Sequence, residues 1–215
     1  VKGQNEVIYT NSIYNGKDRH LNGFNQANIS QWHPTLWIVD ARGSTNRQDT
    51  NDKNNLEKKF LRPILDRLKQ NKTVLLPVDG LARTLELLMV LNDFWEKRPN
   101  DPRPIYFLSH YSVDIYDTVN KFTDWLNNDL KKKFTETLEK PFELPRIRCI
   151  KKIEDIEGLG QQPCIILATS DTLERGFSRK LFIDTIGRSS NLIFFTTAEP
   201  KNSLAEQLRV DNTHR

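Results

Sequence analysis

The sequence predicts an α/β domain with a doubly wound, mostly parallel sheet that runs from about Leu36 to the end of the chain. Short apolar runs alternate several times with amphipathic helical patterns, and connections of that length suit crossovers between parallel strands. With 215 residues, the chain is long enough to bury a core of its own. No apolar run approaches the roughly 20 residues that a membrane span needs, so we expect no membrane partner.

Six apolar runs, rich in β-branched and aromatic residues, are the predicted strands. They cover residues 36–40, 72–78, 104–109, 146–152, 164–170 and 191–197. Helical periodicity predicts helices over residues 56–70, 81–97, 113 into the 130s, 179–186 and 203–210. Pro63 is expected to kink the first helix, and Ser112 and Ser178 are expected helix caps, with Gly187 ending the helix that Ser178 begins.

The first 35 residues differ from the rest and are expected to form a separate unit. They contain the strand-like run VIYT, which is followed by the polar loop NSIYNGKDRHLNG. We expect this strand and loop to pair with a part of the structure that lies outside this chain.

The motifs of common nucleotide and metal sites are missing from the sequence. It contains no G-x-G-x-x-G after a strand, no P-loop and no G-x-S-x-G elbow, which disfavours a small-molecule-binding α/β domain. The histidines His20, His33, His110 and His214 are too far apart to assemble a hydrolytic metal cluster. Cys149 and Cys164 lie in apolar runs and are expected to be buried free thiols. We therefore expect no metal and no cofactor.

In a doubly wound sheet, ligands bind beyond the carboxyl ends of the strands. The residues that follow four of the predicted strands are Asp40, Asp79 with Gly80, Ser109 with His110, and the segment 169–179. Asp79 is more typical of a helix cap than of a reactive group. Asp40 fits a structural cap and a former site residue equally well.

Positive charge is concentrated between residues 131 and 152. The whole chain has a net charge of +4, whereas this segment alone carries eight Lys and Arg against three Glu, a local balance of +5. Seven of these cations are candidates for contact with RNA or an acidic partner: Lys131, Lys132, Lys133, Arg146, Arg148, Lys151 and Lys152. The alternative is a solvated helix end followed by an edge strand that cations protect from aggregation.

Five stretches carry a characteristic order of motifs. They are VIYTNSIYNGKDRHLNG, PTLWIVDARGST, VLLPVDGLARTLELLMVLNDFW, PCIILATSDTLERGFSRKLF and SNLIFFTTAEPKNSLAEQL. In this order and with this spacing, they resemble the β-CASP family of the metallo-β-lactamase superfamily. The resemblance implies that residues 1–35 are the end of a metallo-β-lactamase-like domain and that residues 36–215 form a β-CASP domain.

Active β-CASP members are zinc-dependent RNA or DNA endonucleases, in which two metal ions hold the scissile phosphate and activate a water molecule. The resemblance places Ser12 where a carboxylate bridges the two metals, Asp40 where the β-CASP domain opens with an acidic residue, and Gln207 at the histidine of T-L-A-x-H. A serine hydroxyl cannot replace a bridging anion, and a glutamine cannot shuttle a proton. Two of these three positions are therefore lost, which makes the set degenerate, and we expect no catalytic residue.

Within the family, this pattern resembles the branch of non-catalytic subunits of the cleavage and polyadenylation specificity factor. That resemblance implies a pseudo-nuclease in the nucleus, which acts as an interaction module beside the catalytic β-CASP nuclease subunit and the scaffold of the 3′-end processing complex, and which contacts pre-mRNA. Two alternatives stay open. One is an active zinc-dependent β-CASP RNA endonuclease, and the other is the inactive β-CASP subunit of the Integrator complex.

Overall fold

A five-stranded sheet forms the centre of the computed structural model, which describes residues 6–11, 13–14, 16–25, 27–40, 53–81, 83–186, 191–197 and 202–213. Its strands are β3 (Val74–Val78), β4 (Ile105–Leu108), β5 (Ile147–Ile150), β6 (Ile165–Thr169) and β7 (Leu192–Ile193). Their spatial order is β5-β4-β6-β3-β7, and each neighbouring pair is parallel. The predicted doubly wound parallel sheet is confirmed.

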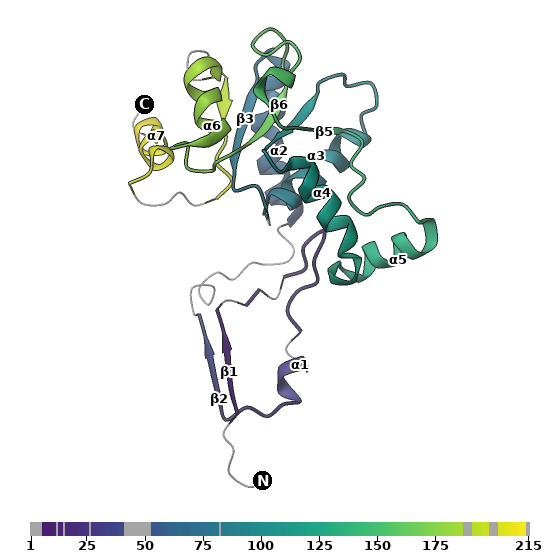
Figure 1. Cartoon of the computed structure of the whole chain (residues 1–215). Coiled ribbons are helices and arrows are strands. Elements are labelled where there is room, and N and C mark those ends of the chain that lie inside the picture. Colours follow the sequence, from purple (N-terminus) through teal and green to yellow (C-terminus); the bar gives the residue numbers. More distant parts are fainter. Residues whose placement is uncertain are drawn as a thin grey trace.

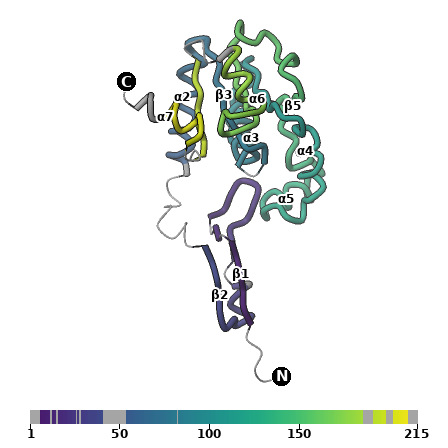
Figure 2. Tube along the Cα trace, turned by 60° about the vertical axis from the view of Figure 1, so that its left-hand side comes forward, coloured from purple at the N-terminus to yellow at the C-terminus, as the bar shows by residue number. Residues whose placement is uncertain are grey.

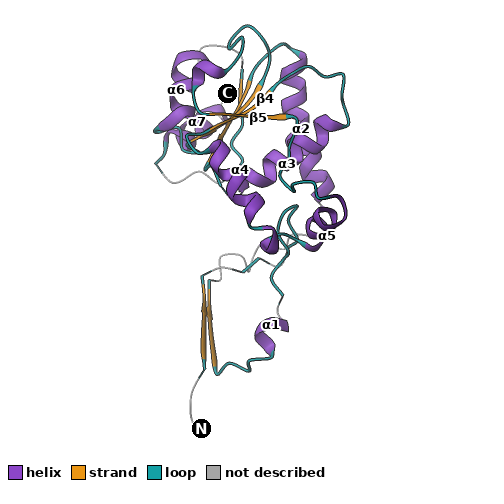
Figure 3. Ribbon diagram, turned by 45° about the vertical axis from the view of Figure 1, so that its right-hand side comes forward, coloured by secondary structure: helices purple, strands orange, loops and turns teal. Residues whose placement is uncertain are grey.

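Helices cover both faces of this sheet, as Figures 1 and 3 show. On one face, α2 (Lys53–Lys69), α3 (Arg83–Glu96) and α4 (Ser112–Lys121) pack against one set of strand side chains. On the other face, α6 (Gly176–Leu181) and α7 (Leu204–Thr213) pack against the alternate set. The side chains divide this way because successive strand residues point to opposite faces of a sheet. Leu76 thus belongs to the first core cluster and Leu75 to the second.

The helix predicted from residue 113 into the 130s is two helices joined by a 3₁₀ turn. After α4 ends at Lys121, η3 spans Thr123–Trp125 and α5 spans Asn128–Thr137. Asn127 caps α5, since its side-chain oxygen accepts the backbone N–H of Leu130 at 2.9 Å. Asparagine is among the best N-cap residues. The break is therefore encoded by one polar residue, which apolar periodicity does not detect.

The other elements lie close to their predicted positions, with shifts at their ends. The helix α2 continues through Pro63 without interruption. Tyr111 is the N-cap of α4, so Ser112 lies inside the helix, and Ser178 likewise lies inside α6. The predicted stop, Gly187, lies outside the described residues. A π-helical turn, η5 (Phe182–Ile186), follows α6, and the 3₁₀ turn η4 (Ile153–Asp155) follows β5.

A second, smaller sheet is formed near the start of the chain. It pairs β1 (Val7–Thr10) with β2 (Leu36–Val39) in parallel, and the short helix α1 (Ala27–Ser30) lies between them in sequence. Figure 2 shows this pair of strands standing apart from the main body. Two predictions are therefore wrong. Residues 36–40 are not a strand of the main sheet, and the first strand pairs within the chain.

The strand β2 is also exposed, unlike the fully buried strand β3. Leu36 is 51% exposed and Ile38 is 45% exposed. A short run of β-branched and aromatic residues fits any pleated surface, so its composition does not say which sheet it joins. Within the described part of the chain, no helix is both long enough and apolar enough to cross a membrane.

Candidate functional site

The carboxyl ends of β3, β4 and β6 border a cavity of about 540 Å³. Its lining includes Asp79, Gly80, Ser109, His110, Tyr111 and Thr169. The residues that follow these three strands therefore meet at one edge of the sheet, as expected for ligand sites of this fold. Asp40 does not follow a strand of the main sheet, because it comes directly after β2 of the smaller sheet.

The turn after β3 is held by Asp79. Its Oδ1 accepts the backbone N–H of Leu81 at 3.0 Å and the hydroxyl hydrogen of Thr84 at 2.8 Å. Gly80 has a φ of +96°, and a Cβ atom on it would lie 3.1 Å from Cγ2 of Thr169. Since α3 begins only at Arg83, Asp79 forms a local Asx turn rather than the predicted helix cap. The carboxylate is therefore structural.

The segment after β4 is held in a similar way by two serines. The Oγ of Ser109 accepts the backbone N–H of Tyr111 at 3.3 Å, and the Oγ of Ser112 donates to the carbonyl of Ile150 at 3.0 Å. The imidazole of His110 lies against the ring of Phe177, with the centroids 4.4 Å apart. Asp114 in the first turn of α4 adds a second carboxylate to the cavity. Carboxylates beside the starts of α3 and α4 make this edge unfavourable for a phosphate group.

The loop after β6 folds back on its own strand. The hydroxyl of Ser178 donates to the carbonyl of Ser170, and the guanidinium of Arg179 donates to the carbonyl of Leu173 at 3.4 Å. Gly176 has a φ of +76°, and a Cβ atom there would come within 2.7 Å of the carbonyl oxygen of Thr169. Only glycine fits this position without a clash. These motif residues therefore serve the backbone of the loop.

The start of α7 carries Gln207. The N–H of Glu206 donates to Oγ of Ser203 at 3.2 Å, and the Glu206 carboxylate accepts the N–H of Asn202 at 2.6 Å. This reciprocal pair resembles a capping box. The N–H of Ala205 donates to the carbonyl of Thr172 at 3.3 Å, which joins α7 to the loop after β6. Gln207 is exposed in the first turn of a helix that this loop positions.

Of the other two positions that the resemblance singled out, Ser12 lies outside the described residues. Asp40 is partly exposed and directly follows β2. Among the residues that the structure describes, no group of three or more His, Cys, Asp and Glu side chains is arranged to hold a metal ion.

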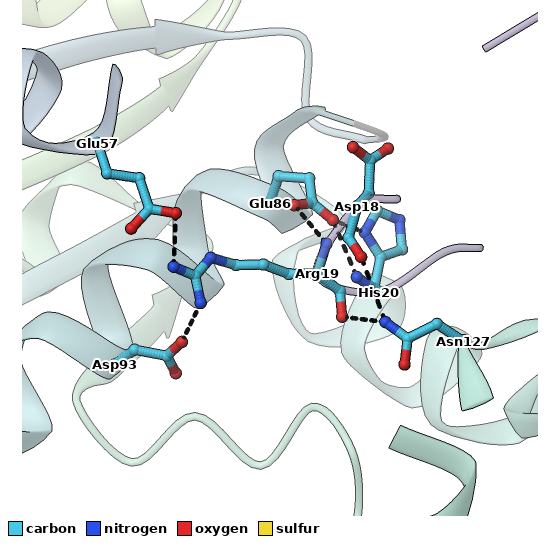
Figure 4. A network of polar contacts seen from close by, with 7 residues as sticks. All are labelled: Asp18, Arg19, His20, Glu57, Glu86, Asp93 and Asn127. Carbon is cyan, nitrogen blue, oxygen red and sulfur yellow. Dashed lines mark hydrogen bonds and ion pairs between the residues drawn. The ribbon is translucent and has the colours of Figure 1, made fainter. Parts of the chain in front are cut away.

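A polar network that the sequence did not predict joins the loop 17–22 to three helices (Figure 4). Arg19 reaches between two helices, with Nη2 2.7 Å from a carboxylate oxygen of Glu57 in α2 and Nη1 2.5 Å from one of Asp93 in α3. The backbone N–H groups of Arg19 and His20 both donate to Glu86, at 2.9 and 3.0 Å. The imidazole Nδ1 of His20 contacts the same carboxylate. We call this network the loop clamp.

Asn127 completes the loop clamp from the start of α5. Its Nδ2 donates to the carbonyls of Asp18 and Arg19, at 3.3 and 2.6 Å, and its backbone N–H donates to the carbonyl of His20 at 2.8 Å. The imidazole of His20 also packs edge-on against Phe142. One buried asparagine thus caps a helix and holds a loop more than a hundred residues earlier. The sequence signals of this network were the run Asp-Arg-His and Asn127, the first of two consecutive asparagines.

The loop clamp shifts the pKa values of two of its carboxyl groups. Burial alone would raise the pKa of Glu86, but hydrogen bonds from the His20 side chain and from two backbone N–H groups outweigh it and hold this pKa below its usual value. Burial raises the pKa of Asp93, and the nearby charge of Arg19 offsets part of that rise. Glu86 is therefore the carboxylate that the clamp stabilises most strongly in its charged form.

The seven predicted contact cations divide into structural and exposed groups. Arg146 donates to the carbonyls of Arg98 and Asp101, at 3.2 and 2.8 Å, and thereby serves the fold. Four others form ion pairs with carboxylates; the pairs are Lys132–Glu136, Lys133–Glu139, Arg148–Glu157 and Lys151–Asp114. Lys131 lies in α5, and Lys152 is exposed just after β5. Exposed pairs of this kind contribute little stability, so their cationic groups can exchange partners.

Both thiols are free, as the sequence predicted. Cys164 is buried and Cys149 is partly buried. Burial raises the pKa of each thiol to about 11. At neutral pH both groups are therefore protonated and poorly nucleophilic.

Comparisons with known proteins agree with this architecture. Residues 84–208 match the family model described as the Beta-Casp domain. The chain is 33% identical over 210 residues to "Cleavage and polyadenylation specificity factor subunit 2" of Oryza sativa subsp. japonica, which covers 98% of this chain and 28% of that protein. It is 34% identical over 218 residues to "Cleavage factor two protein 2" of Schizosaccharomyces pombe, covering 96% and 27%. It is 24% identical over 209 residues to "Endoribonuclease YSH1" of Saccharomyces cerevisiae, covering 95% and 26%.

The fold and the matched model together define the class of this protein: the chain belongs to the β-CASP family of the metallo-β-lactamase superfamily. It spans little more than a quarter of the length of the relatives named above.

Proposed function

We propose that this chain is the β-CASP part of a non-catalytic subunit of the nuclear machinery that cleaves and polyadenylates pre-mRNA. It corresponds to the 100-kDa subunit of the cleavage and polyadenylation specificity factor. The observation that carries the proposal is Gln207, which stands in the first turn of α7 where the active family pattern has a histidine. A carboxamide neither accepts nor releases a proton near neutral pH, so it cannot act as a general acid.

Ser12 supports the same conclusion. In the active pattern this position supplies the anion that bridges two metal dications, and a neutral hydroxyl leaves their mutual repulsion unscreened. Zinc is expected only if the chain is an active nuclease. Asp40 is retained, but one carboxylate does not assemble a two-metal centre.

The relatives favour the same branch. Identity is 33% to the rice protein called subunit 2 and 24% to the yeast protein called an endoribonuclease, over almost the same stretch. In this proposal the chain acts beside a catalytic β-CASP nuclease subunit and a scaffold. The accessible members of the basic segment contact pre-mRNA or an acidic partner, above all the exposed Lys132 and Lys133 of α5 together with the partly buried Lys131. The part up to β2 is the end of a metallo-β-lactamase-like domain.

The second candidate is an active zinc-dependent RNA endonuclease. The observation that favours it is the similarity to "Endoribonuclease YSH1", which covers 95% of this chain. The two candidates differ in an outcome that is simple to measure, because an active enzyme needs tightly bound metal and loses activity when the metal is removed.

The test uses the full-length protein that contains this chain. It is incubated with a 3′-end RNA substrate, with and without EDTA, and its zinc content is measured by mass spectrometry. We expect no chelator-sensitive cleavage, whereas an active β-CASP nuclease assayed in parallel cuts the RNA. We also expect the protein to co-purify with the catalytic nuclease subunit of the 3′-end processing complex. Cleavage that EDTA abolishes would refute the proposal, and co-purification with Integrator subunits instead would assign the chain to that complex.

A further inference from the structure

Two aromatic rings project from the junction between α4 and α5. Phe122, directly after α4, is 55% exposed, and Trp125, the last residue of η3, is 75% exposed. Large aromatic side chains are normally much more buried, and an exposed pair of them marks an interaction site. We call Phe122 and Trp125 the aromatic step.

The backbone that carries the aromatic step is firmly anchored. Leu126, next to the tryptophan, is 3% exposed and belongs to the main core cluster. Asn127 follows it and is held by the loop clamp through its side chain and its backbone N–H. The N–H of Trp125 itself donates to the carbonyl of Phe122 at 3.1 Å. An exposed ring on an anchored backbone is preorganised, so a ligand that stacks on it loses little entropy in ordering it.

Four lysines lie close to the aromatic step in the sequence. Lys121 precedes it, and Lys131, Lys132 and Lys133 lie in the first turns of α5. Acidic residues lie in the same stretch, and three of them form exposed ion pairs, which are Lys17–Asp129, Lys132–Glu136 and Lys133–Glu139. Exposed pairs of this kind are weak, so a phosphate group can compete for the lysines. Three residues of connecting chain and about one turn of α5 separate Trp125 from Lys131. The Cα atoms of these two residues can therefore lie at most about 16 Å apart.

We propose that the aromatic step and the lysines of α5 form a binding platform for single-stranded RNA. Unpaired bases stack on the rings of Trp125 and Phe122, and the ammonium groups of Lys131, Lys132 and Lys133 contact the phosphates. Exposed aromatic rings beside cations are the combination by which proteins hold single strands without base-specific hydrogen bonds. An apolar protein surface would use the rings but would have to desolvate the ion pairs Lys132–Glu136 and Lys133–Glu139, which is costly. This inference deepens the proposed function and rests on it for the identity of the ligand as RNA.

The test measures binding of the full chain to a fluorescein-labelled twelve-nucleotide oligouridine by fluorescence anisotropy, over a series of salt concentrations. We expect Trp125→Ala to weaken binding about fivefold or more, because stacking contributes roughly 1–3 kcal/mol per base. We expect Trp125→Phe to stay within about twofold of the parent, since it keeps a ring. Trp125→Leu keeps an apolar side chain without a ring, so it should bind as weakly as the alanine variant. Circular dichroism checks that each variant is folded.

Trp32→Ala is the matched control. Trp32 is 61% exposed but lies beyond α1 in the N-terminal unit, so its loss should leave RNA binding unchanged. The triple change Lys131→Glu, Lys132→Glu and Lys133→Glu should weaken binding and reduce its salt dependence, because fewer counterions are released. Equal weakening by the Trp32 and Trp125 changes would overturn the proposal.

Two further outcomes separate this inference from the proposed function. If the Trp125→Ala variant binds the oligouridine as tightly as the parent chain does, the binding platform is refuted. The pseudo-nuclease assignment is not affected by that result. Should Trp125→Ala instead abolish co-purification of the catalytic nuclease subunit and leave RNA affinity unchanged, the aromatic step is a protein interface and the RNA assignment is overturned.

Discussion

Replacing Asn127 by alanine removes three hydrogen bonds from a side chain in a residue that is only 2% exposed. The lost cap of α5 costs about 1 kcal/mol. The carbonyl of Arg19, which accepts the shorter bond from Nδ2 at 2.6 Å, loses this donor in a partly buried site, and an unsatisfied group there costs about 1–3 kcal/mol. We therefore expect Asn127→Ala to lower the free energy of unfolding by about 2–4 kcal/mol, a large share of the 5–15 kcal/mol typical of a domain.

The assay is urea unfolding of the full chain followed by circular dichroism, with the midpoint shifted and the slope unchanged. Asn127→Asp separates the two contributions, because a carboxylate keeps the cap but cannot donate to the carbonyls. This variant should lose about 1–3 kcal/mol. Asn128→Ala is the matched control, since Asn128 is exposed and accepts a long bond of 3.4 Å from Asn22; we expect a change within about 0.5 kcal/mol. An alanine variant at position 127 that is as stable as this control would refute the reasoning.

Three further predictions concern the loop clamp, the loop after β6 and the thiols. The pKa of Glu86 is lowered in the folded state, so this carboxylate stabilises the fold above its ordinary pKa near 4.5 and stops doing so as the pH falls. We therefore expect the Glu86→Gln variant to be less stable than the parent at pH 7. The difference in stability between the two proteins should shrink when the pH is lowered. At Gly176 the φ is +76° and a Cβ atom would make a contact of 2.7 Å, so Gly176→Ala should lower the free energy of unfolding by more than about 1 kcal/mol. Gly158 has a similar φ of +61° but a nearest contact of 3.4 Å, so Gly158→Ala should lower it by less in the same urea unfolding assay. Since burial raises the pKa of Cys149 and Cys164 to about 11, both thiols should react with a thiol reagent at pH 7 far more slowly than in urea, and equal rates in the two conditions would contradict their burial.

The main sheet could be predicted from the sequence because its strands are covered on both faces. A strand such as β3, whose five residues are all buried, must be a continuous apolar run, and few other structures require one. The strand β2 has a similar composition but is exposed, so the same argument placed it in the wrong sheet. Apolar composition indicates that a segment can form a strand, but it does not indicate which strand is its neighbour.

The candidate site was predictable only in part, for a related reason. Parallel topology brings the carboxyl ends of β3, β4 and β6 together, so the meeting of Asp79, Ser109 and Thr169 at one cavity follows from the order of elements. The loop clamp does not follow from topology, because it depends on where a loop of the N-terminal unit docks. Arg19 and Glu86 are 67 residues apart in sequence, and nothing local to either residue indicates the other.

The motif residues that this chain retains and those that it has replaced differ in what they do for the fold. Gly176 is retained where a Cβ atom would strike a carbonyl oxygen, and Ser178 is retained where its hydroxyl closes the loop after β6. Gln207, by contrast, occupies an exposed position in the first turn of α7, where the fold places little constraint on the side chain. A change at position 207 should therefore cost the fold little, whereas a change at Gly176 strains it. The proposed loss of nuclease chemistry at position 207 is therefore compatible with an intact fold, which is what the proposed interaction subunit requires.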